Sequence, residues 1–309
     1  MEKYDLTIIG GGPAGVAAGV YAARKKIRTV VVTKTFGGQS VVSDDIQNWI
    51  GDVSISGINL SKRLKAHLLA YANGDVKVME GKLVETVSKS AEGFETKLGS
   101  GETILSKTIL ITTGSKRRKL AIKGADEYEN KGITYCASCD GPLFAGKDVT
   151  VIGGGNAALE TAAQLAAYCR NVTILQRSGQ WRADPVTVEK VLAKPNISAV
   201  LNTELLEIKG GKFVSAISYR KTDTNEIVEL PTTGIFVEIG HVPATDFVKN
   251  LLKTDEWGHI VVDPKTQRTS QSGVWAAGDA TDGLYHQNNI AAGDAVKALE
   301  DIYLFLHTR

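Results

Sequence analysis

Two cysteines separated by two residues and followed directly by an aspartate, Cys136, Cys139 and Asp140, are the residues of this 309-residue chain best suited to chemistry. A structural zinc site needs four ligands, whereas the chain offers no second C-x-x-C pair, one remote cysteine and five scattered histidines. We therefore expect no metal site. A disulfide between residues three apart can close at a helix start, where the helix terminus stabilises a thiolate. The pair is predicted to do redox work.

Residue type alone supports interpretations of Asp140, of the third cysteine and of the histidines. Asp140 is suited to exchange protons with the thiolates, but an aspartate before Pro142 is equally suited to cap a helix, and the residues leave these alternatives open. Cys169, in a helical stretch, is expected to pack as a small hydrophobe. The histidines have no triad-like partners in sequence and are expected to lie at the surface or to be satisfied locally, with His241 and His286 left open because they fall inside candidate site segments.

A glycine-rich turn occurs twice, each time between an apolar strand and a helix. The strands expected before the turns cover residues 6–9 and 149–152, and the helices after them cover 16–26 and 159–169. In such a turn the glycines let the backbone approach a pyrophosphate, and the helix N-terminus attracts it. Two dinucleotides are therefore expected to bind. The predicted phosphate-binding residues are Gly10, Gly12, Pro13, Ala14 and Gly15 in the first copy, and Gly153, Gly155, Asn156, Ala157 and Ala158 in the second.

The order of the elements predicts an α/β fold with two Rossmann-like domains, the second inserted into the first. Strands are expected at residues 29–32, 108–111, 172–175, 235–239 and 274–276. Ligands of open α/β sheets bind at the carboxyl ends of the strands, so Thr113, Gly114, Gly278 and Asp279 are expected near the first nucleotide. The predicted domains are residues 1–113 with 245–309, and residues 114–244. The predicted crossings between them are 114–118 and 240–244.

Composition excludes several function classes. The formal charge of +2 is too balanced for nucleic acid or an anionic membrane to be the main partner. The 32 glycines suit an α/β protein with many tight turns. No apolar stretch resembles a signal peptide or a membrane span, so a cytoplasmic protein is expected.

The order of these motifs resembles low-molecular-weight thioredoxin reductases over essentially the whole chain. The resemblance is equally close to the flavoprotein part of alkyl hydroperoxide reductase, whose extra N-terminal domains find no counterpart here, and thioredoxin reductase is the simpler expectation. The motifs that carry it are residues 9–15, 37–39, 48–49, 112–114, 136–140, 153–160, 240–243, 278–280 and 285–287.

The resemblance implies an FAD domain made of both chain ends, an inserted NAD(P)H domain that carries the cysteines, a homodimer, and rotation between domains. It implies that electrons pass from the nicotinamide through FAD to the disulfide and on to thioredoxin or a thioredoxin-like protein. Cys139 would face the flavin, Cys136 would exchange with the substrate, and Asp140 would be the acid–base residue. The cofactor-binding set implied in addition to the glycine turns comprises Gly38, Gln39, Asn48, Thr113, Gly114, Gly278, Asp279 and Gln287 for FAD, and Glu160 for the nicotinamide.

Two departures from the family pattern concern the cofactors. The acidic residue that often binds the adenosine ribose of FAD is missing from residues 32–36, where Lys34 is suited either to a phosphate or to solvent. In the nicotinamide domain one of the paired arginines typical of NADPH users is replaced, and Gln176 stands where NADH users have glutamate. Arg177 and Arg182 could still bind a 2′-phosphate, so NADPH is favoured, with NADH as the alternative.

Three other functions remain open from the sequence. The chain could supply a peroxiredoxin through a carrier protein, because both roles need the same active site. It could depend on ferredoxin, although the intact residues 153–160 argue against this. It could also be a nucleotide-binding sensor without turnover, which the retained cysteine pair and Asp140 disfavour.

Overall fold

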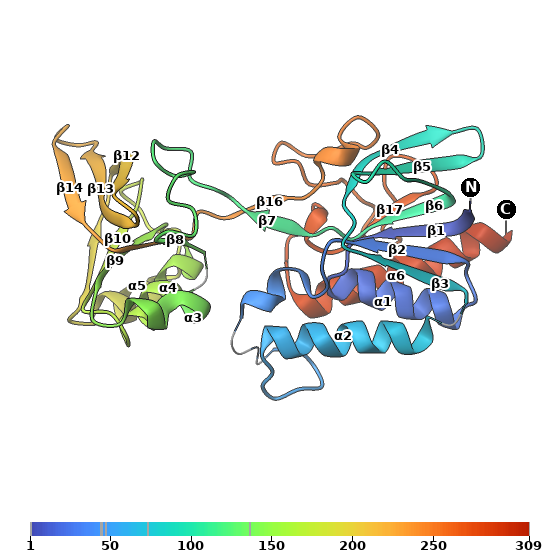
Figure 1. Ribbon diagram of the computed structural model, residues 1–309, viewed down its shortest axis with the longest axis horizontal. Coiled ribbons are helices and arrows are strands. Elements are labelled where there is room, and N and C mark those ends of the chain that lie inside the picture. Colours follow the sequence, from blue (N-terminus) through green and yellow to red (C-terminus); the bar gives the residue numbers. More distant parts are fainter. Residues whose placement is uncertain (1, 44–45, 47, 73, 136, 309) are drawn as a thin grey trace. The chain divides into compact units, whose positions relative to one another are not determined.

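The computed structural model describes residues 2–43, 46, 48–72, 74–135 and 137–308, with only the backbone of Val42, Ser138 and Cys139. The chain divides into two compact units (Figure 1). The discontinuous unit comprises Met1–Lys116 and Val242–Arg309, and the inserted unit comprises Arg117–His241. No helix among the described residues is both long enough and apolar enough to cross a membrane.

The discontinuous unit is built on a mixed sheet in the order β3-β2-β1-β6-β5-β4, with β17 also paired to β6. The strands β1, β2, β3, β6 and β17 run parallel, whereas β5 pairs antiparallel with β4 and β6. Their bounds are β1 Lys3–Ile9, β2 Thr29–Thr33, β3 Val76–Glu80, β4 Val84–Ser90, β5 Gly93–Leu98, β6 Thr103–Ile111 and β17 Val274–Ala276. The helices are α1 Pro13–Arg24, α2 Gly57–Tyr71 and α6 Asn288–Thr308, with short 3-10 turns η1 Gly38–Val42, η3 Asp246–Val248 and η4 Gly278–Ala280.

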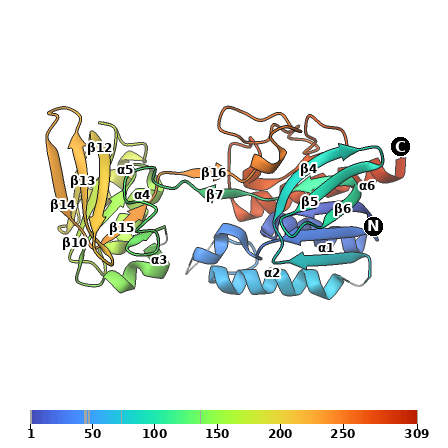
Figure 2. The same ribbon diagram turned by 45° about the horizontal axis from the view of Figure 1, so that its top comes forward.

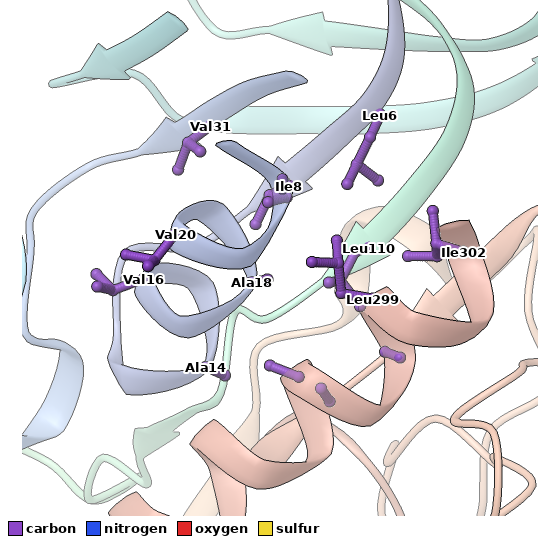
Figure 3. Close-up of a cluster of buried hydrophobic side chains, with 14 of the residues drawn as sticks. Leu6, Ile8, Ala14, Val16, Ala18, Val20, Val31, Leu110, Leu299 and Ile302 are labelled. Atoms are coloured by element: carbon purple, nitrogen blue, oxygen red, sulfur yellow. The ribbon is translucent and has the colours of Figure 1, made fainter. Parts of the chain in front are cut away.

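Two apolar layers cover the faces of this sheet. Alternate residues of β6 face opposite sides, so Leu110 packs against α1 and α6 whereas Ile109 and Ile111 join the layer beneath β4 and β5. On the helical side, α1 presents small residues such as Ala18, which let it lie close to α6 (Figure 3). Leu299 and Ile302 of α6 are fully buried there. This packing fixes the N-terminus of α1 at the carboxyl end of β1.

The inserted unit has three layers. Its parallel sheet, in the order β11-β10-β9-β15-β8, has helices on one face and the antiparallel sheet β12-β13-β14 on the other (Figure 2). Phe236 of β15 faces the helices, whereas its neighbours Ile235 and Val237 face the antiparallel sheet. The strands are β8 Ile133–Thr134, β9 Asp148–Ile152, β10 Asn171–Leu175, β11 Ile197–Val200, β12 Thr203–Gly210, β13 Val214–Lys221, β14 Ile227–Pro231 and β15 Gly234–Val237. The helices are α3 Ala137–Asp140, α4 Asn156–Leu165 and α5 Pro185–Leu192, and the 3-10 turn η2 spans Gly141–Phe144.

Two short strands connect the units. β7, Ser115–Arg117, leaves the discontinuous unit and β16, His241–Pro243, returns to it, and the two pair with each other. The division between the units falls at residues 116/117 and 241/242, inside the two segments where the sequence places the crossings.

The α/β fold with two nucleotide-binding-type sheets is confirmed, and the strand positions agree closely. The predicted strand at residues 274–276 is β17 without change, and the strand predicted at 235–239 ends at Val237. The helices α1 and α4 begin earlier than predicted, at Pro13 and Asn156, because each starts directly at its glycine turn. Sequence reasoning did not anticipate α2, α6 or the antiparallel sheet β12-β13-β14.

The packing of α6 generates a stability prediction. Ile302 is fully buried beneath the sheet, whereas Leu304, two residues later on the same helix, is 55% exposed. Ile302→Ala should lower the free energy of unfolding by about 2–5 kcal/mol, since it removes buried methyl groups and leaves a cavity. Leu304→Ala is the matched control and should change it by less than about 0.5 kcal/mol. Urea denaturation of the two variants measures both values, and equal losses would contradict the assigned core.

Candidate active site

The glycine turn after β1 forms one wall of a cavity of about 580 Å³ in the discontinuous unit. Gly10 has φ +122°, and a Cβ there would collide with the carbonyl oxygen of Thr112, so the turn requires glycine. At Gly12 the only described atom within 4 Å of the point that a Cβ would occupy is the Cα of Gly38, at 3.9 Å, so this glycine leaves room at the wall of the cavity. The α1 N-terminus therefore presents bare backbone to the cavity, as a phosphate site requires.

Most of the residues predicted for the first nucleotide line this cavity. They are Gly10, Gly12, Pro13, Ala14, Gly38, Gln39, Thr113, Gly114, Gly278 and Asp279. Gly15 does not line it: a Cβ there would collide with the carbonyl oxygen of Gly10, so this glycine permits close packing of α1 on its own turn. Ser40 also lines the cavity and was not predicted from the sequence, and its hydroxyl donates to Asn288 Oδ1 at 2.8 Å.

A second cavity, of about 540 Å³, adjoins the first and shares Gln39, Ser40 and Asp279 with it. Its wall contains the remaining predicted pair, Asn48 and Gln287, whose side chains are bonded to each other at 3.1 Å. The loop around residue 48 thus lies against the segment before α6, although the two are far apart in sequence. The predicted flavin residues of both chain halves are brought together in one place.

The larger cavity is also lined by the segment at the end of β2, where the sequence lacks the acidic residue that often binds the adenosine ribose of FAD. Lys34 and Thr35 line it where an acidic residue was expected, and the Thr33 hydroxyl donates to the Thr35 carbonyl at 2.7 Å. The cavity still contains a carboxylate, that of Glu85 in β4, which lines it together with Lys82. Sequence reasoning missed Glu85 since it belongs to a strand outside the βαβ unit.

The second glycine turn, after β9, repeats the geometry of the first within the inserted unit. Gly153 has φ +145°, and a Cβ there would collide with the carbonyl oxygen of Glu238. At Gly155 no described atom lies within 4 Å of the point that a Cβ would occupy, so this glycine too faces open space at the start of α4. Asn156, Ala157, Ala158 and Glu160 follow on that helix, where Ala158 is buried and Glu160 is exposed.

The loop after β10 lies against this turn. The Arg182 amide donates to the carbonyl of Gly154 at 2.8 Å, and Asn156 bonds both the carboxylate and the amide of Asp184, at 2.8 and 2.9 Å. Arg177, like Arg182, is exposed. The two predicted arginines are therefore on one loop beside the second phosphate-type site.

Gln176 is the buried anchor of that loop. Its amide nitrogen donates to Ser178 Oγ at 2.9 Å and to the carbonyl of Gln180 at 3.0 Å, while its Oε1 accepts from the Arg177 amide at 3.0 Å. Gly154 lies directly over this side chain and has no room for a Cβ. Gln176 therefore shapes the loop, and recognition of a ligand falls to its exposed neighbours.

The redox segment follows β8. Cys136 lies outside the described residues, and the side chain of Cys139 is not described, so their pairing stays a prediction. Around them, the hydroxyl of Thr134 donates to the carboxylate of Asp140, and Asp140 makes no side-chain cap to the following turn among the described contacts. The structure thus favours Asp140 as a positioned carboxylate over the capping alternative. Thr134 carries no sequence signal and was not predicted.

The comparisons with known proteins agree with this geometry. The family model described as pyridine nucleotide-disulphide oxidoreductase matches residues 4–295. The chain belongs to this family. Its structure superimposes on thioredoxin reductase from Lactococcus lactis with a TM-score of 0.88 at 32% identity, covering 99% of this chain and 100% of that one. Thioredoxin reductase from T. acidophilum gives 0.85 at 37% identity, covering 98% of each chain.

Curated relatives carry other names. A protein named NADH dehydrogenase from Bacillus subtilis is 39% identical over 96% of this chain and 57% of its own length. An alkyl hydroperoxide reductase component of Pseudomonas putida is 40% identical over 96% of this chain and 57% of its own length. The chain thus spans a little more than half the length of these relatives. The predicted resemblance to low-molecular-weight thioredoxin reductases is confirmed, together with membership of the pyridine nucleotide-disulphide oxidoreductase family.

Burial sets the ionisation of several groups in the inserted unit. Burial, with Asp148 nearby, raises the pKa of Cys169 to about 11, which disfavours its thiolate, and the side chain packs in the core of the inserted unit as predicted. Burial also raises the pKa of Glu238, against the opposing effect of Arg117. In the described part of the chain no three His, Cys, Asp or Glu side chains gather as metal ligands.

The anchoring role of Gln176 is testable. Gln176→Met keeps the volume but removes the side-chain bonds within the loop, so the Arg177 amide should exchange its hydrogen about tenfold faster or more, as expected for a loss of about 1–3 kcal/mol. Hydrogen exchange of peptides covering the loop measures this. Gln180→Met is the control, because Gln180 is exposed and only its carbonyl takes part. Equal hydrogen-exchange rates of the loop in both variants would contradict the anchoring role of Gln176.

Proposed function

We propose that this oxidoreductase is a thioredoxin reductase-like enzyme that transfers electrons from NAD(P)H through FAD and the Cys136/Cys139 pair to thioredoxin or a thioredoxin-like protein. The observation that carries the proposal is the contact between the Thr134 hydroxyl and the carboxylate of Asp140, the residue that follows Cys139 in the sequence, within the unit that holds the second glycine turn. The full-length similarity to two thioredoxin reductases supports it.

The first cavity fits FAD. Its open Gly12 backbone at the α1 N-terminus suits the pyrophosphate, since backbone N–H groups and the helix dipole favour anions. Asp279 and Gln39 line both adjoining cavities and would hold the region between phosphate and ring, with Gln287 and Asn48 at the second cavity. When bound, the flavin would supply the means to take a hydride from the nicotinamide and deliver an electron pair to the disulfide.

The residues of this chain would contribute proton handling and exchange. Asp140, held by the Thr134 hydroxyl, would receive and return the proton of a thiol of the pair. Cys136 would attack or release the partner's disulfide as a thiolate, and Cys139 would be the sulfur on the flavin side. The assignment of the two sulfurs rests on the family resemblance.

NADPH is the proposed donor. Arg177 and Arg182 are exposed on the loop beside the second glycine turn, and a guanidinium suits a phosphate through paired, charge-assisted bonds. Gln176 carries no charge that would repel the 2′-phosphate, and its amide is already engaged within the loop. NADH is the alternative, since two similar relatives are named NADH dehydrogenase.

A second candidate partner follows from the relatives. Several similar proteins are named as components of alkyl hydroperoxide reductase, which favours a role in feeding a peroxiredoxin system through a carrier protein. Both roles use the same residues of this chain and differ in the surface of the partner. Turnover with purified thioredoxin, compared with turnover with a peroxiredoxin and its carrier, distinguishes them.

We propose in addition that the protein acts as a cytoplasmic homodimer.

The proposed roles predict that loss of Cys136 abolishes reduction of the disulfide partner but not reduction of the flavin by NADPH. Cys136→Ser should lower reduction of a disulfide partner by about a hundredfold or more, because no thiolate remains for exchange, while flavin bleaching by NADPH stays unchanged. Stopped-flow absorption and a thioredoxin-coupled assay measure the two halves. Cys169→Ala is the control and should preserve both. Loss of flavin bleaching in the Cys136 variant would refute the proposed order of steps.

The donor preference predicts a selective loss. Arg177→Ala should weaken NADPH binding about tenfold, a change of about 1.4 kcal/mol, while NADH binding shifts by less than about twofold. Titration calorimetry with each nucleotide measures both. Arg170→Ala removes another exposed arginine of the inserted unit, one that pairs with Asp148, and should leave both affinities unchanged. An unchanged NADPH affinity in the Arg177 variant would refute the proposal that Arg177 binds the 2′-phosphate of NADPH.

A further inference from the structure

We propose that Glu85 of β4 is the carboxylate that binds the adenosine ribose of FAD. The inference deepens the proposed function, because it rests on FAD occupying the larger cavity of the discontinuous unit. In a dinucleotide-binding βαβ unit, an acidic residue about 20 residues after the glycine turn binds the ribose hydroxyls. In this chain that position falls at the end of β2, where residues 32–36 contain no carboxylate. The acceptor for the ribose must therefore come from another element.

The end of β2 lies against the first glycine turn but offers no charged acceptor. Thr33 Oγ1 lies 2.5 Å from the point that a Cβ of Gly11 would occupy, and its hydroxyl donates to the Thr35 carbonyl at 2.7 Å. The ammonium group of Lys34 can only donate. The Thr33 carbonyl in turn accepts from the Lys82 amide at 3.2 Å. The chain between β3 and β4 is thus tied to the end of β2, and the first residues of β4 line the same cavity.

An irregularity in β4 sets the position of Glu85. Val84 and Thr86 pair with consecutive residues of β5, so Glu85 between them is an extra residue in the strand. Bulges of this kind re-aim a side chain and are frequent beside binding sites. The Glu85 side chain is exposed and lines the cavity. Its neighbour on the β5 side is Gly99, where a Cβ would lie 3.3 Å from Glu85 Oε1, so no side chain of that residue crowds the carboxylate.

Glu85 is also the carboxylate of this cavity that is available for the ribose. The described residues lining the cavity include three carboxylates, those of Glu85, Asp246 and Asp279. Asp246 is paired with Lys116 at 3.3 Å, and Asp279 is shared with the second cavity, beside the residues proposed for the flavin ring. In the described part of the chain, the Glu85 carboxylate has no hydrogen-bond or ion-pair partner.

A free carboxylate suits the two neighbouring hydroxyls of a ribose. When ionised it only accepts hydrogen bonds, and its two oxygens can receive both hydroxyl protons in charge-assisted bonds. Lys82, which also lines the cavity, does not compete for Glu85, because its ammonium group is bound to Glu102 at 2.6 Å. Glutamine at position 85 would keep the size of the side chain but lose its charge and one acceptor oxygen.

The experiment titrates the full-length protein, freed of flavin, with FAD and with an FAD analogue whose adenosine lacks the 2′-hydroxyl. Calorimetry gives both affinities. The wild-type protein should bind the analogue about tenfold more weakly than FAD, since a hydrogen bond to a charged group is lost. Glu85→Gln should bind FAD about tenfold more weakly than the wild-type protein, and its preference for FAD over the analogue should fall below about threefold, because the partner of the hydroxyl is changed.

Glu95→Gln is the matched control. Glu95 is an exposed carboxylate of β5 that lines neither described cavity, so this variant should keep both wild-type affinities. An unchanged FAD affinity in Glu85→Gln would overturn the ribose assignment, and so would an equal loss for FAD and the analogue, which indicates a structural role. Either result leaves the proposed function standing. Failure of the wild-type protein to bind FAD would overturn both.

Discussion

The close approach of each glycine turn to a neighbouring strand is the constraint on which both candidate sites depend. After β1, the backbone at Gly10 passes so near the Thr112 carbonyl that no side chain fits, and after β9 the backbone at Gly153 does the same against Glu238. Each contact joins a glycine turn to the end of an adjacent parallel strand, β6 in one unit and β15 in the other. The helix that follows therefore starts at a fixed point, with its N-terminal backbone open.

The two units share this arrangement of strand, glycine turn and helix, but different residues follow the neighbouring strand in each. In the discontinuous unit the strand end beside the turn leads to Thr113, Gly114 and the large cavity. In the inserted unit it leads to Glu238, whose side chain reaches Thr161 and Arg117, and through Arg117 the carbonyl before Cys136. The second glycine turn and the redox segment are thereby parts of one connected arrangement.

The sequence predicts the elements that obey a local rule. The strands and glycine turns were found because apolar runs ending in glycine have a periodicity and a turn chemistry that short windows reveal. The helix α6 was missed, although its packing on α1 closes the first unit, because its burial depends on partners far away in sequence. The residues predicted for the first nucleotide line the two adjoining cavities, with Gly15 as a packing residue rather than a cavity residue.

Two of the residues that sequence reasoning missed act through another side chain or reach the site from a distant segment. Thr134 holds Asp140, and Glu85 reaches the cavity from a strand outside the nucleotide-binding unit. Gln176 was noticed in the sequence for its place in the nicotinamide loop, but its role in shaping that loop was not foreseen. Polar residues of this kind follow no motif, because their roles are defined by distances between segments. Asp140 illustrates the gain from structure: the sequence left a helix cap open, whereas its described contacts include no side-chain cap to the following turn and its carboxylate accepts from the Thr134 hydroxyl instead.

The most direct test of the account is an anaerobic titration of the FAD-loaded protein with NADPH and, separately, with NADH. The account predicts that NADPH bleaches the flavin band and that the wild-type protein consumes more reductant than a Cys136→Ser/Cys139→Ser variant, the excess being the electron pair stored in the disulfide. Equal consumption by the two proteins would contradict a redox-active pair. No bleaching with either nucleotide would contradict the proposed entry of electrons through the inserted unit.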